Sequence, residues 1–251
     1  MEDYKDFIIA ESYTLPSLGK VYEGSVNPNI KIRSMTTEEE MKRLGHSDTP
    51  YKMLSEIIDD CLVEKPGIPT YDLCVGDYQF LLHKLRIVTY GKDYKIETRC
   101  PICGKLNEYT IDLESLNVVK YTEDFAKYFN ITLPKSKKKV ELRLQTPRML
   151  DEINNRSKEL LKKSPDMKGE PAFLFTLQSL IYKVDGEVLD DVKAEAFVRH
   201  LPMIDANYII RSVDKINIGI DTKLSLQCKH CGIEYSQIFP ITGEFFGPSI
   251  D

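Results

Sequence analysis

Two short cysteine stretches, Cys100-Pro101-Ile102-Cys103-Gly104 and Cys228-Lys229-His230-Cys231-Gly232, decide how the rest of this chain is interpreted. Each stretch places two thiols two residues apart, so that both sulfurs can reach one metal. Each also ends in a glycine, which allows a tight backbone turn. Two such pairs supply the four thiolates of a tetrahedral structural zinc site. We therefore predict one structural Zn²⁺ per chain, and its expected ligands are Cys100, Cys103, Cys228 and Cys231.

The residues on both sides of each cysteine stretch alternate between polar and apolar, which is typical of β-strands. The alternating segments are residues 93–99 and 107–113 around the first stretch, and 222–227 and 233–239 around the second. Strand, cysteine turn and strand, occurring twice, indicate a zinc ribbon whose halves are far apart in the sequence. Four cysteines leave no open coordination position, so the metal is expected to stabilise the fold and not to catalyse.

Other uses of cysteine are less consistent with this pattern. A thioredoxin-like redox pair has the same spacing, but neither stretch here begins a helix. The chain shows no signal peptide and no dense cysteine framework, so a reducing compartment is expected and disulfides are disfavoured. His230 could replace one cysteine ligand, but with four cysteines present we expect it to be exposed or beside the ligands. Cys61 and Cys74 have no matching pair and are predicted not to bind metal.

The composition disfavours several classes of protein. The chain has 251 residues and a net charge of −5, whereas general nucleic-acid binders usually carry a basic excess. No apolar run is long enough to span a bilayer. We find no phosphate-binding loop, dinucleotide fingerprint, zinc-protease motif or nucleophile elbow, so we expect a protein that is not an enzyme.

We expect an α+β fold in which a mainly helical insertion separates the two ribbon halves. The predicted parts are an N-terminal arm (1–34), a helical region (35–92), the ribbon halves (93–120 and 215–251) and the insertion (121–214).

Local signals predict individual helices. Thr36 or Thr37, with glutamate three residues later, predicts a helix start, and Pro50 suits the first turn of the next helix. Gly76-Asp77 is expected to cap a helix over about residues 77–89, on which His83 is interpreted as a surface or core residue. In the insertion we expect helices at 147–163, 172–182, 189–200 and 203–214, and a strand at 140–144.

The order of these features resembles the baseplate hub and tail-assembly proteins of T4-like contractile-tailed bacteriophages. The segments that carry the resemblance are residues 15–22 (LPSLGKVY), 30–40, 85–91, 140–147 and the second cysteine stretch followed by Phe245-Phe246. The resemblance implies a non-enzymatic role in building the phage tail. The protein would be either a hub component that stays in the virion baseplate, or an assembly factor that acts in the host cytoplasm and then leaves.

The resemblance also implies contacts with other hub and tail proteins. We expect these contacts at Leu15, Pro16 and Tyr22, or at Phe245 and Phe246, although the two phenylalanines could equally return to the core. The alternative is a zinc-ribbon module that binds nucleic acid. Basic and acidic residues balance around the cysteine stretches, which disfavours this alternative. No oligomeric state is predicted.

Overall fold

The structure is a computed structural model that describes residues 9–166, 168–239 and 245. It is an α+β protein, as predicted, with helices and several small antiparallel sheets. The helices are α1 (Thr37–Arg43), α2 (Pro50–Cys61), α3 (Val75–Tyr90), α4 (Ala126–Phe129), α5 (Pro147–Lys163), α6 (Pro171–Leu180), α7 (Asp191–Arg199) and α8 (Met203–Asp214), with short 3₁₀ turns η2 (Thr70–Asp72), η3 (Leu113–Ser115) and η4 (Glu123–Phe125).

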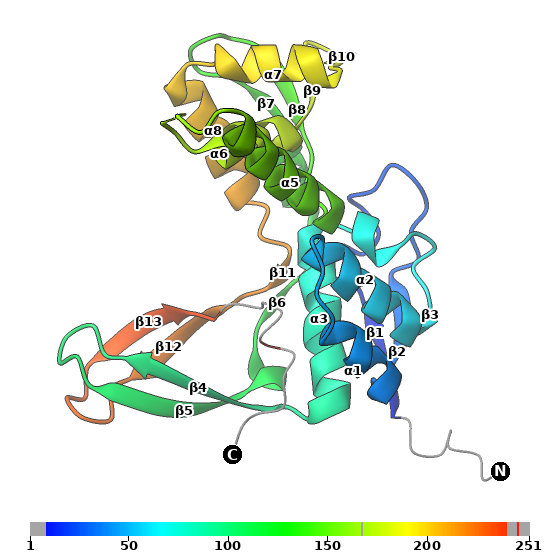
Figure 1. The fold of residues 1–251 in the computed structure, drawn as a ribbon, viewed down its shortest axis with the longest axis vertical. Coiled ribbons are helices and arrows are strands. Elements are labelled where there is room, and N and C mark those ends of the chain that lie inside the picture. Colours follow the sequence, from blue (N-terminus) through cyan, green and yellow to red (C-terminus); the bar gives the residue numbers. More distant parts are fainter. Residues whose placement is uncertain (1–8, 167, 240–244, 246–251) are drawn as a thin grey trace.

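The strands form five separate sheets within the described residues. They are β1 (Ala10–Thr14), β2 (Asn29–Arg33), β3 (Leu62–Glu64), β4 (Asp93–Arg99), β5 (Leu106–Asp112), β6 (Val118–Val119), β7 (Asn130–Thr132), β8 (Lys139–Leu142), β9 (Ile181–Val184), β10 (Glu187–Val188), β11 (Gly219–Ile220), β12 (Lys223–Gln227) and β13 (Glu234–Ile238). Figure 1 shows three parts: a body built around α3, a ribbon of β4, β5, β12 and β13, and an insertion containing α5–α8. No helix among the described residues is long and apolar enough to cross a membrane.

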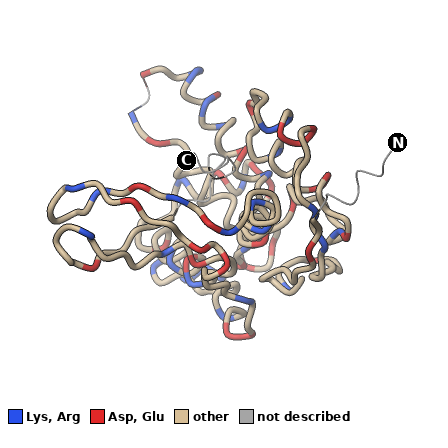
Figure 2. Tube along the Cα trace, turned by 90° about the horizontal axis from the view of Figure 1, so that it is seen from below, with Lys and Arg blue, Asp and Glu red and all other residues tan. Residues whose placement is uncertain are grey.

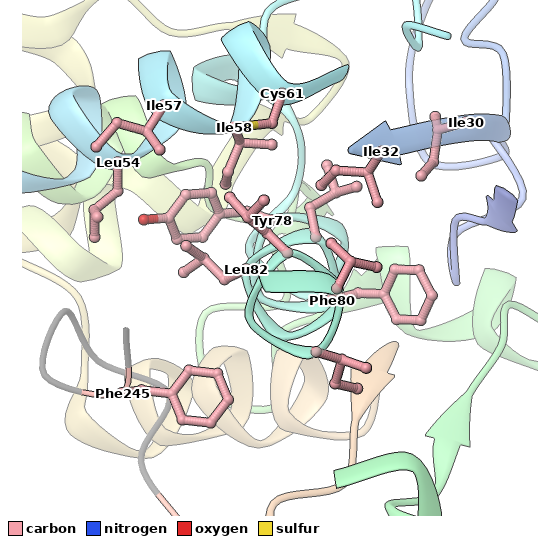
Figure 3. Packing of buried hydrophobic residues seen from close by; sticks show 14 of the residues in the cluster. Ile30, Ile32, Leu54, Ile57, Ile58, Cys61, Tyr78, Phe80, Leu82 and Phe245 are labelled. Carbon is pink, nitrogen blue, oxygen red and sulfur yellow. The ribbon is translucent and has the colours of Figure 1, made fainter. Parts of the chain in front are cut away.

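The body packs the sheet β1-β2-β3 and helices α1–α3 around one apolar core. Figure 3 shows Ile32 of β2 and Ile57 and Ile58 of α2 close to the side chains of α3, and all three are at most 1% exposed. The predicted capping box at the start of α1 is present, because Thr36 accepts from the backbone of α1 while Glu39 accepts from Thr36 N. The N-terminal strands therefore pack on this chain's own body.

The start of α3 differs from the prediction. The helix begins at Val75, and Asp77 is not its cap but a buried carboxylate inside the first turn. Its oxygens accept hydrogen bonds from Ser17 N (2.9 Å), Ser17 Oγ (2.5 Å) and Tyr22 OH (2.6 Å). Asp77 thus fastens the segment around residues 15–22 to α3, a contact between distant parts of the sequence that local helix signals do not reveal.

The insertion has its own core, which lies between helices and a four-stranded antiparallel sheet in the order β10-β9-β8-β7. The sequence predicted β8 but not the other three strands. It also extended α6 to residue 182, whereas α6 ends at Leu180 and β9 begins at Ile181. Ile181 is buried against β8 and belongs to this core, so sheet pairing ends the helix earlier than its local pattern suggests.

The chain leaves the body through β6 and returns through β11, and these two strands pair antiparallel. The returning chain crosses α3 at Gly76, where an added Cβ would lie 2.1 Å from the carbonyl oxygen of Ile218. A second connection comes from α5. Asp151, which is 1% exposed, accepts hydrogen bonds from Lys52 N at the start of α2 (2.9 Å) and from Tyr71 OH (3.1 Å). The strand pair and the Asp151 contacts therefore both hold the insertion to the body.

Candidate metal centre

The two predicted ribbon halves are antiparallel hairpins, one formed by β4 and β5 and the other by β12 and β13. Their strands agree with the predicted segments to within a residue at each end. The pairing continues to the cysteine turns, where Arg99 faces Leu106 in the first hairpin and Gln227 faces Glu234 in the second. Figure 1 shows the hairpins side by side, extending away from α3. Both turns therefore lie together at the far end of the ribbon.

The two cysteine turns have the same backbone geometry. Gly104 N donates to Cys100 O at 2.9 Å, and Gly232 N donates to Cys228 O at the same distance. The φ angles of Gly104 and Gly232 are 70° and 73°, a region that residues with a Cβ rarely adopt. The glycine in each C-x-x-C-G stretch is thus required by the turn, as the sequence predicted.

The four cysteine sulfurs gather in one cluster, within 4.8 Å of one another. The Cys100 and Cys231 sulfurs are 3.8 Å apart, and those of Cys103 and Cys228 are 3.7 Å apart. A tetrahedral zinc with Zn–S bonds of about 2.3 Å requires sulfurs about 3.8 Å apart. A disulfide requires about 2.05 Å. The donor set and its spacing fit a tetrahedral metal better than they fit disulfides.

Backbone N–H groups favour the thiolate form that metals bind. Ile102 N donates to Cys100 Sγ, and His230 N donates to Cys228 Sγ, each at 3.4 Å. A backbone hydrogen bond from Cys103 is the main cause that lowers the pKa of Cys100. Burial acts to raise the pKa of Cys228, but the backbone N–H groups of its turn outweigh burial and lower this pKa to about 6. A larger fraction of these two cysteines is therefore present as the thiolate that a metal binds.

Asn107 of β5 joins the two turns. Its side chain is 2% exposed, and its amide nitrogen donates to Lys105 O of the first turn (3.0 Å). Its amide oxygen accepts from Lys229 N of the second turn (2.9 Å). Asn107 was not among the predicted site residues, because only the folded ribbon brings the second turn to it. In β5, Asn107 alternates with exposed neighbours and shares the inward face with Tyr109, and this alternation was the available signal.

His230 lies outside the sulfur cluster. Its Nε2 atom is 3.1 Å from Leu106 O on the opposite hairpin, so the ring bridges the hairpins beside the ligands. Cys61 and Cys74 are buried in the body, at 0% and 2% exposed, and neither belongs to the cluster. Within the described residues, no other group of three or more His, Cys, Asp or Glu side chains is close enough to hold a metal. If zinc binds here, four sulfur ligands leave it no position for a substrate.

The residues predicted to contact partners are mostly inside the chain. Leu15, Pro16 and Phe245 are buried, and Tyr22 is half-buried with its hydroxyl bound to Asp77. The ring of Phe245 packs against those of Tyr94 and Phe239, with centroids 5.2 and 5.3 Å apart, so this phenylalanine returns to the core. Phe246 lies outside the described residues. Leu15, Pro16 and Phe245 thus offer no exposed side chain to a partner in this conformation.

Comparison with known proteins identifies the family. A family model described as T4 bacteriophage base plate protein matches residues 8–247, which is nearly the whole chain. No curated protein and no solved structure gives a match. The family match confirms the resemblance to T4-like baseplate proteins that the order of sequence features predicted. The chain belongs to the T4 bacteriophage base plate protein family.

Proposed function

We propose that the protein acts without catalysis in the baseplate hub of a contractile phage tail, either as a hub component or as a factor that assembles the hub. The observation that carries this proposal is the family match over residues 8–247, which makes the chain a phage baseplate protein. The role follows from contacts with other baseplate proteins. Those contacts would form in the host cytoplasm during assembly and, for a hub component, persist in the virion tail.

The shape of the molecule supports a role in making contacts. The body, the ribbon and the insertion extend in different directions and offer separate surfaces (Figure 1). A zinc ion held by Cys100, Cys103, Cys228 and Cys231 would fasten the two hairpins of the ribbon into one rigid unit. Rigid surfaces lose less entropy on binding than flexible ones, so a metal-fastened ribbon is suited to present a contact surface.

The charge on the ribbon does not favour the nucleic-acid alternative. Figure 2 shows acidic and basic positions interspersed along both hairpins. On the exposed face of β4 and β5, Glu97 pairs in register with Glu108, and the basic Lys95 and Arg99 lie two residues before and after Glu97 on the same face. A phosphate backbone requires a basic surface, and a face that mixes both signs does not provide one.

The test is quantitative mass spectrometry of purified phage particles beside lysate from infected cells. A hub component is expected in the particles at a fixed ratio to other baseplate proteins. An assembly factor is expected in the lysate, in complexes with baseplate proteins, and not in the particles. A phage that lacks the gene serves as the control and should form no complete tails. Complete tails in that control, with the protein in neither particles nor baseplate complexes, would refute the proposal.

A further inference from the structure

Strand β1 is an edge of the sheet β1-β2-β3, and its pairing with β2 shows which backbone groups face away from the sheet. Directly opposite residues of an antiparallel pair alternate between pairs that exchange backbone hydrogen bonds and pairs that do not. Next to one end of β1, Leu15 N donates to the opposite Pro28 O at 2.8 Å. Next to the other end, Ser34 N donates to the opposite Ile9 O at 2.8 Å. The bonded positions on this strand are therefore the odd-numbered ones.

The even-numbered residues of β1 direct their backbone groups to the open side of the strand. These residues are Ala10, Ser12 and Thr14, and all three are exposed or half-buried. Their N–H and C=O groups make no hydrogen bond to any other part of the chain that the structure describes. The open side of β1 thus presents unpaired donors and acceptors, which is what an added strand requires.

The two edges of this sheet differ in how they are protected. At the other edge, β3 has three residues, its register with β2 is irregular, and Lys65-Pro66 follows it. Short strands, irregular pairing, lysine and proline are the usual means by which a sheet edge avoids a further strand. By contrast, β1 has five residues in continuous register with β2 and contains neither lysine nor proline. The sheet is therefore protected at β3 and open at β1.

A hollow of about 520 Å³ lies beside β1. Its lining combines residues of β1, α3 and the segment of β6, including Ser12, Tyr13, Thr14, Phe80, Lys84, Val118 and Lys120. Just after β6, Tyr121 N donates to Pro16 O at 2.8 Å, which joins this segment to the chain beyond the end of β1. Among the described residues, no hydrogen bond joins β6 to the backbone of residues 10–14. Space therefore remains between β1 and β6, next to the unpaired backbone groups.

The hollow is mainly apolar where it borders α3. The rings of Tyr13 and Phe80 meet edge to face with centroids 6.2 Å apart, and Val118 adds an aliphatic side chain to the lining. Lys84 Nζ lies 5.0 Å from the centre of the Tyr13 ring, so this lysine covers aromatic surface as well. A residue of an added strand opposite Tyr13 would direct its side chain into this space, where an apolar group fits best.

The charges around the hollow do not select its occupant. Its lining contains Lys84 and Lys120 as well as Glu64. Burial lowers the pKa of Lys84, whereas the nearby carboxylates of Glu114 and Glu11 act to raise it. Both signs of charge are therefore present, and the unpaired backbone groups decide what can bind.

These backbone groups specify an extended occupant. Groups on one side of a strand recur every two residues, and an extended backbone has the same repeat, whereas a helix uses its backbone groups internally. We propose that an extended segment of another baseplate protein adds to β1 as the fourth strand of this sheet and places an apolar side chain opposite Tyr13. This inference rests on the proposed function, since it assigns that function's contact to one surface.

A second copy of this chain is a poorer occupant. If two copies of β1 paired antiparallel over all five residues, Ser12 would face Ser12 and Glu11 of one copy would face Tyr13 of the other. This register would place a carboxylate in the apolar space beside Tyr13, where it would lose hydration. The segment that adds to β1 is therefore expected from a different protein.

The first test removes one unpaired N–H group from the full chain. Ser12→Pro eliminates an N–H on the open side and keeps the bonds to β2, because an edge strand tolerates proline where its N–H faces solvent. Ser12→Ala is the matched control, since it changes the same side chain and keeps the N–H. We expect Ser12→Pro to reduce recovery of the protein in baseplate complexes at least tenfold and Ser12→Ala to match the wild type, with unchanged circular dichroism for both.

The outcomes of this test separate the inference from the proposed function. If wild-type protein enters baseplate complexes and folded Ser12→Pro enters equally well, the strand inference fails and the proposed function stands. If wild-type protein enters no baseplate complex, the proposed function itself fails.

Hydrogen exchange tests the same pairing without a substitution, so it also decides the matter if Ser12→Pro does not fold. In the isolated full chain, the amides of Ser12 and Thr14 should exchange rapidly, while the amide of Tyr13, which faces β2, should exchange slowly. In purified baseplate complexes, the Ser12 and Thr14 amides should exchange at least tenfold more slowly. Rapid exchange of both amides in complexes that contain the protein would overturn the inference.

Photocrosslinking in infected cells identifies the occupant. A photoreactive amino acid replaces Ile9, which is 59% exposed next to β1, and the control carries it at Val63, which is 56% exposed on β3 at the other edge. We expect at least tenfold more crosslinked product from position 9, joined to a segment of another baseplate protein with apolar residues at alternate positions. Equal yields, or a crosslink to DNA or to a second copy of this chain, would overturn the inference.

Discussion

Replacing Asp151 tests how the insertion is fastened to the body. This carboxylate on α5 is almost fully buried and reaches the first turn of α2, about a hundred residues earlier in the chain. The local cap residue of α2, Thr49, makes no side-chain hydrogen bond to the helix. A capping side chain usually accepts hydrogen bonds from the first backbone N–H groups of a helix. In α2, Asp151 takes this role from a distant part of the chain.

The cost of removing this carboxylate can be worked out from its contacts. It accepts from Lys52 N at 2.9 Å, from Tyr71 OH at 3.1 Å and, at a longer 3.4 Å, from Tyr51 N. Loss of a helix cap costs about 0.5–2 kcal/mol. A hydrogen bond to a charged group contributes about 1.5–3 kcal/mol, and the Tyr71 hydroxyl would lose its acceptor. We expect Asp151→Ala to lower the free energy of unfolding by about 2–4 kcal/mol.

The measurement is urea unfolding of the zinc-loaded full chain, followed by circular dichroism. Glu152→Ala is the matched control, because Glu152 is the exposed neighbour on the same helix and should change stability by less than about 0.5 kcal/mol. Tyr71→Phe removes one donor and keeps the ring, so its cost should be smaller than that of Asp151→Ala. If Asp151→Ala is as stable as Glu152→Ala, the Asp151 carboxylate does not fasten the insertion to the body.

Three further perturbations test other parts of the structure. Burial lowers the pKa of His83 from 6.5 to about 4. The free energy of unfolding should therefore be highest above pH 6.5 and should fall by up to about 1.4 kcal/mol per pH unit as the pH drops towards 4. His83→Gln should weaken this pH dependence in paired unfolding curves. Gly76→Ala should lower the free energy of unfolding by about 1–3 kcal/mol or more, because the new Cβ would lie 2.1 Å from a backbone oxygen. Gly24→Ala is the control and should be nearly neutral, because Gly24 has open space around it. Equal stabilities of the two variants would contradict the close approach of the chain at Gly76. A strong chelator should make the four clustered thiols reactive towards a thiol reagent, while the buried Cys61 and Cys74 stay protected. If the four clustered thiols already react fully before the chelator is added, no metal holds the cluster.

The sequence predicted the features whose signals are local. The spacing of Cys100 and Cys103, and of the second pair, identified the sulfur cluster because each turn is built within five residues. The Thr36 capping box and Pro50 located helix starts for the same reason, since the groups that stabilise those turns are neighbours in the sequence.

The contacts that were missed join distant segments. Asp77 was interpreted as part of a helix cap because aspartate commonly takes that position, yet its partners Ser17 and Tyr22 lie 60 and 55 residues earlier in the chain. Leu15 and Pro16 were expected to contact partners, but both are buried, and no local pattern in this segment shows which of its side chains pack against the body. The short strands β7 and β10 contain too few residues for their alternation to be recognised.

The zinc content of the purified full chain shows directly whether the four clustered cysteines hold a metal. The protein would be prepared in reducing buffer, exchanged into metal-free buffer and measured by elemental mass spectrometry against its protein concentration. We expect one zinc per chain, and much less zinc in Cys228→Ser, which removes a buried ligand. A folded chain that contains no zinc and does not take it up when zinc is added would show that the two hairpins are held together without a metal, and would rule out a structural zinc site.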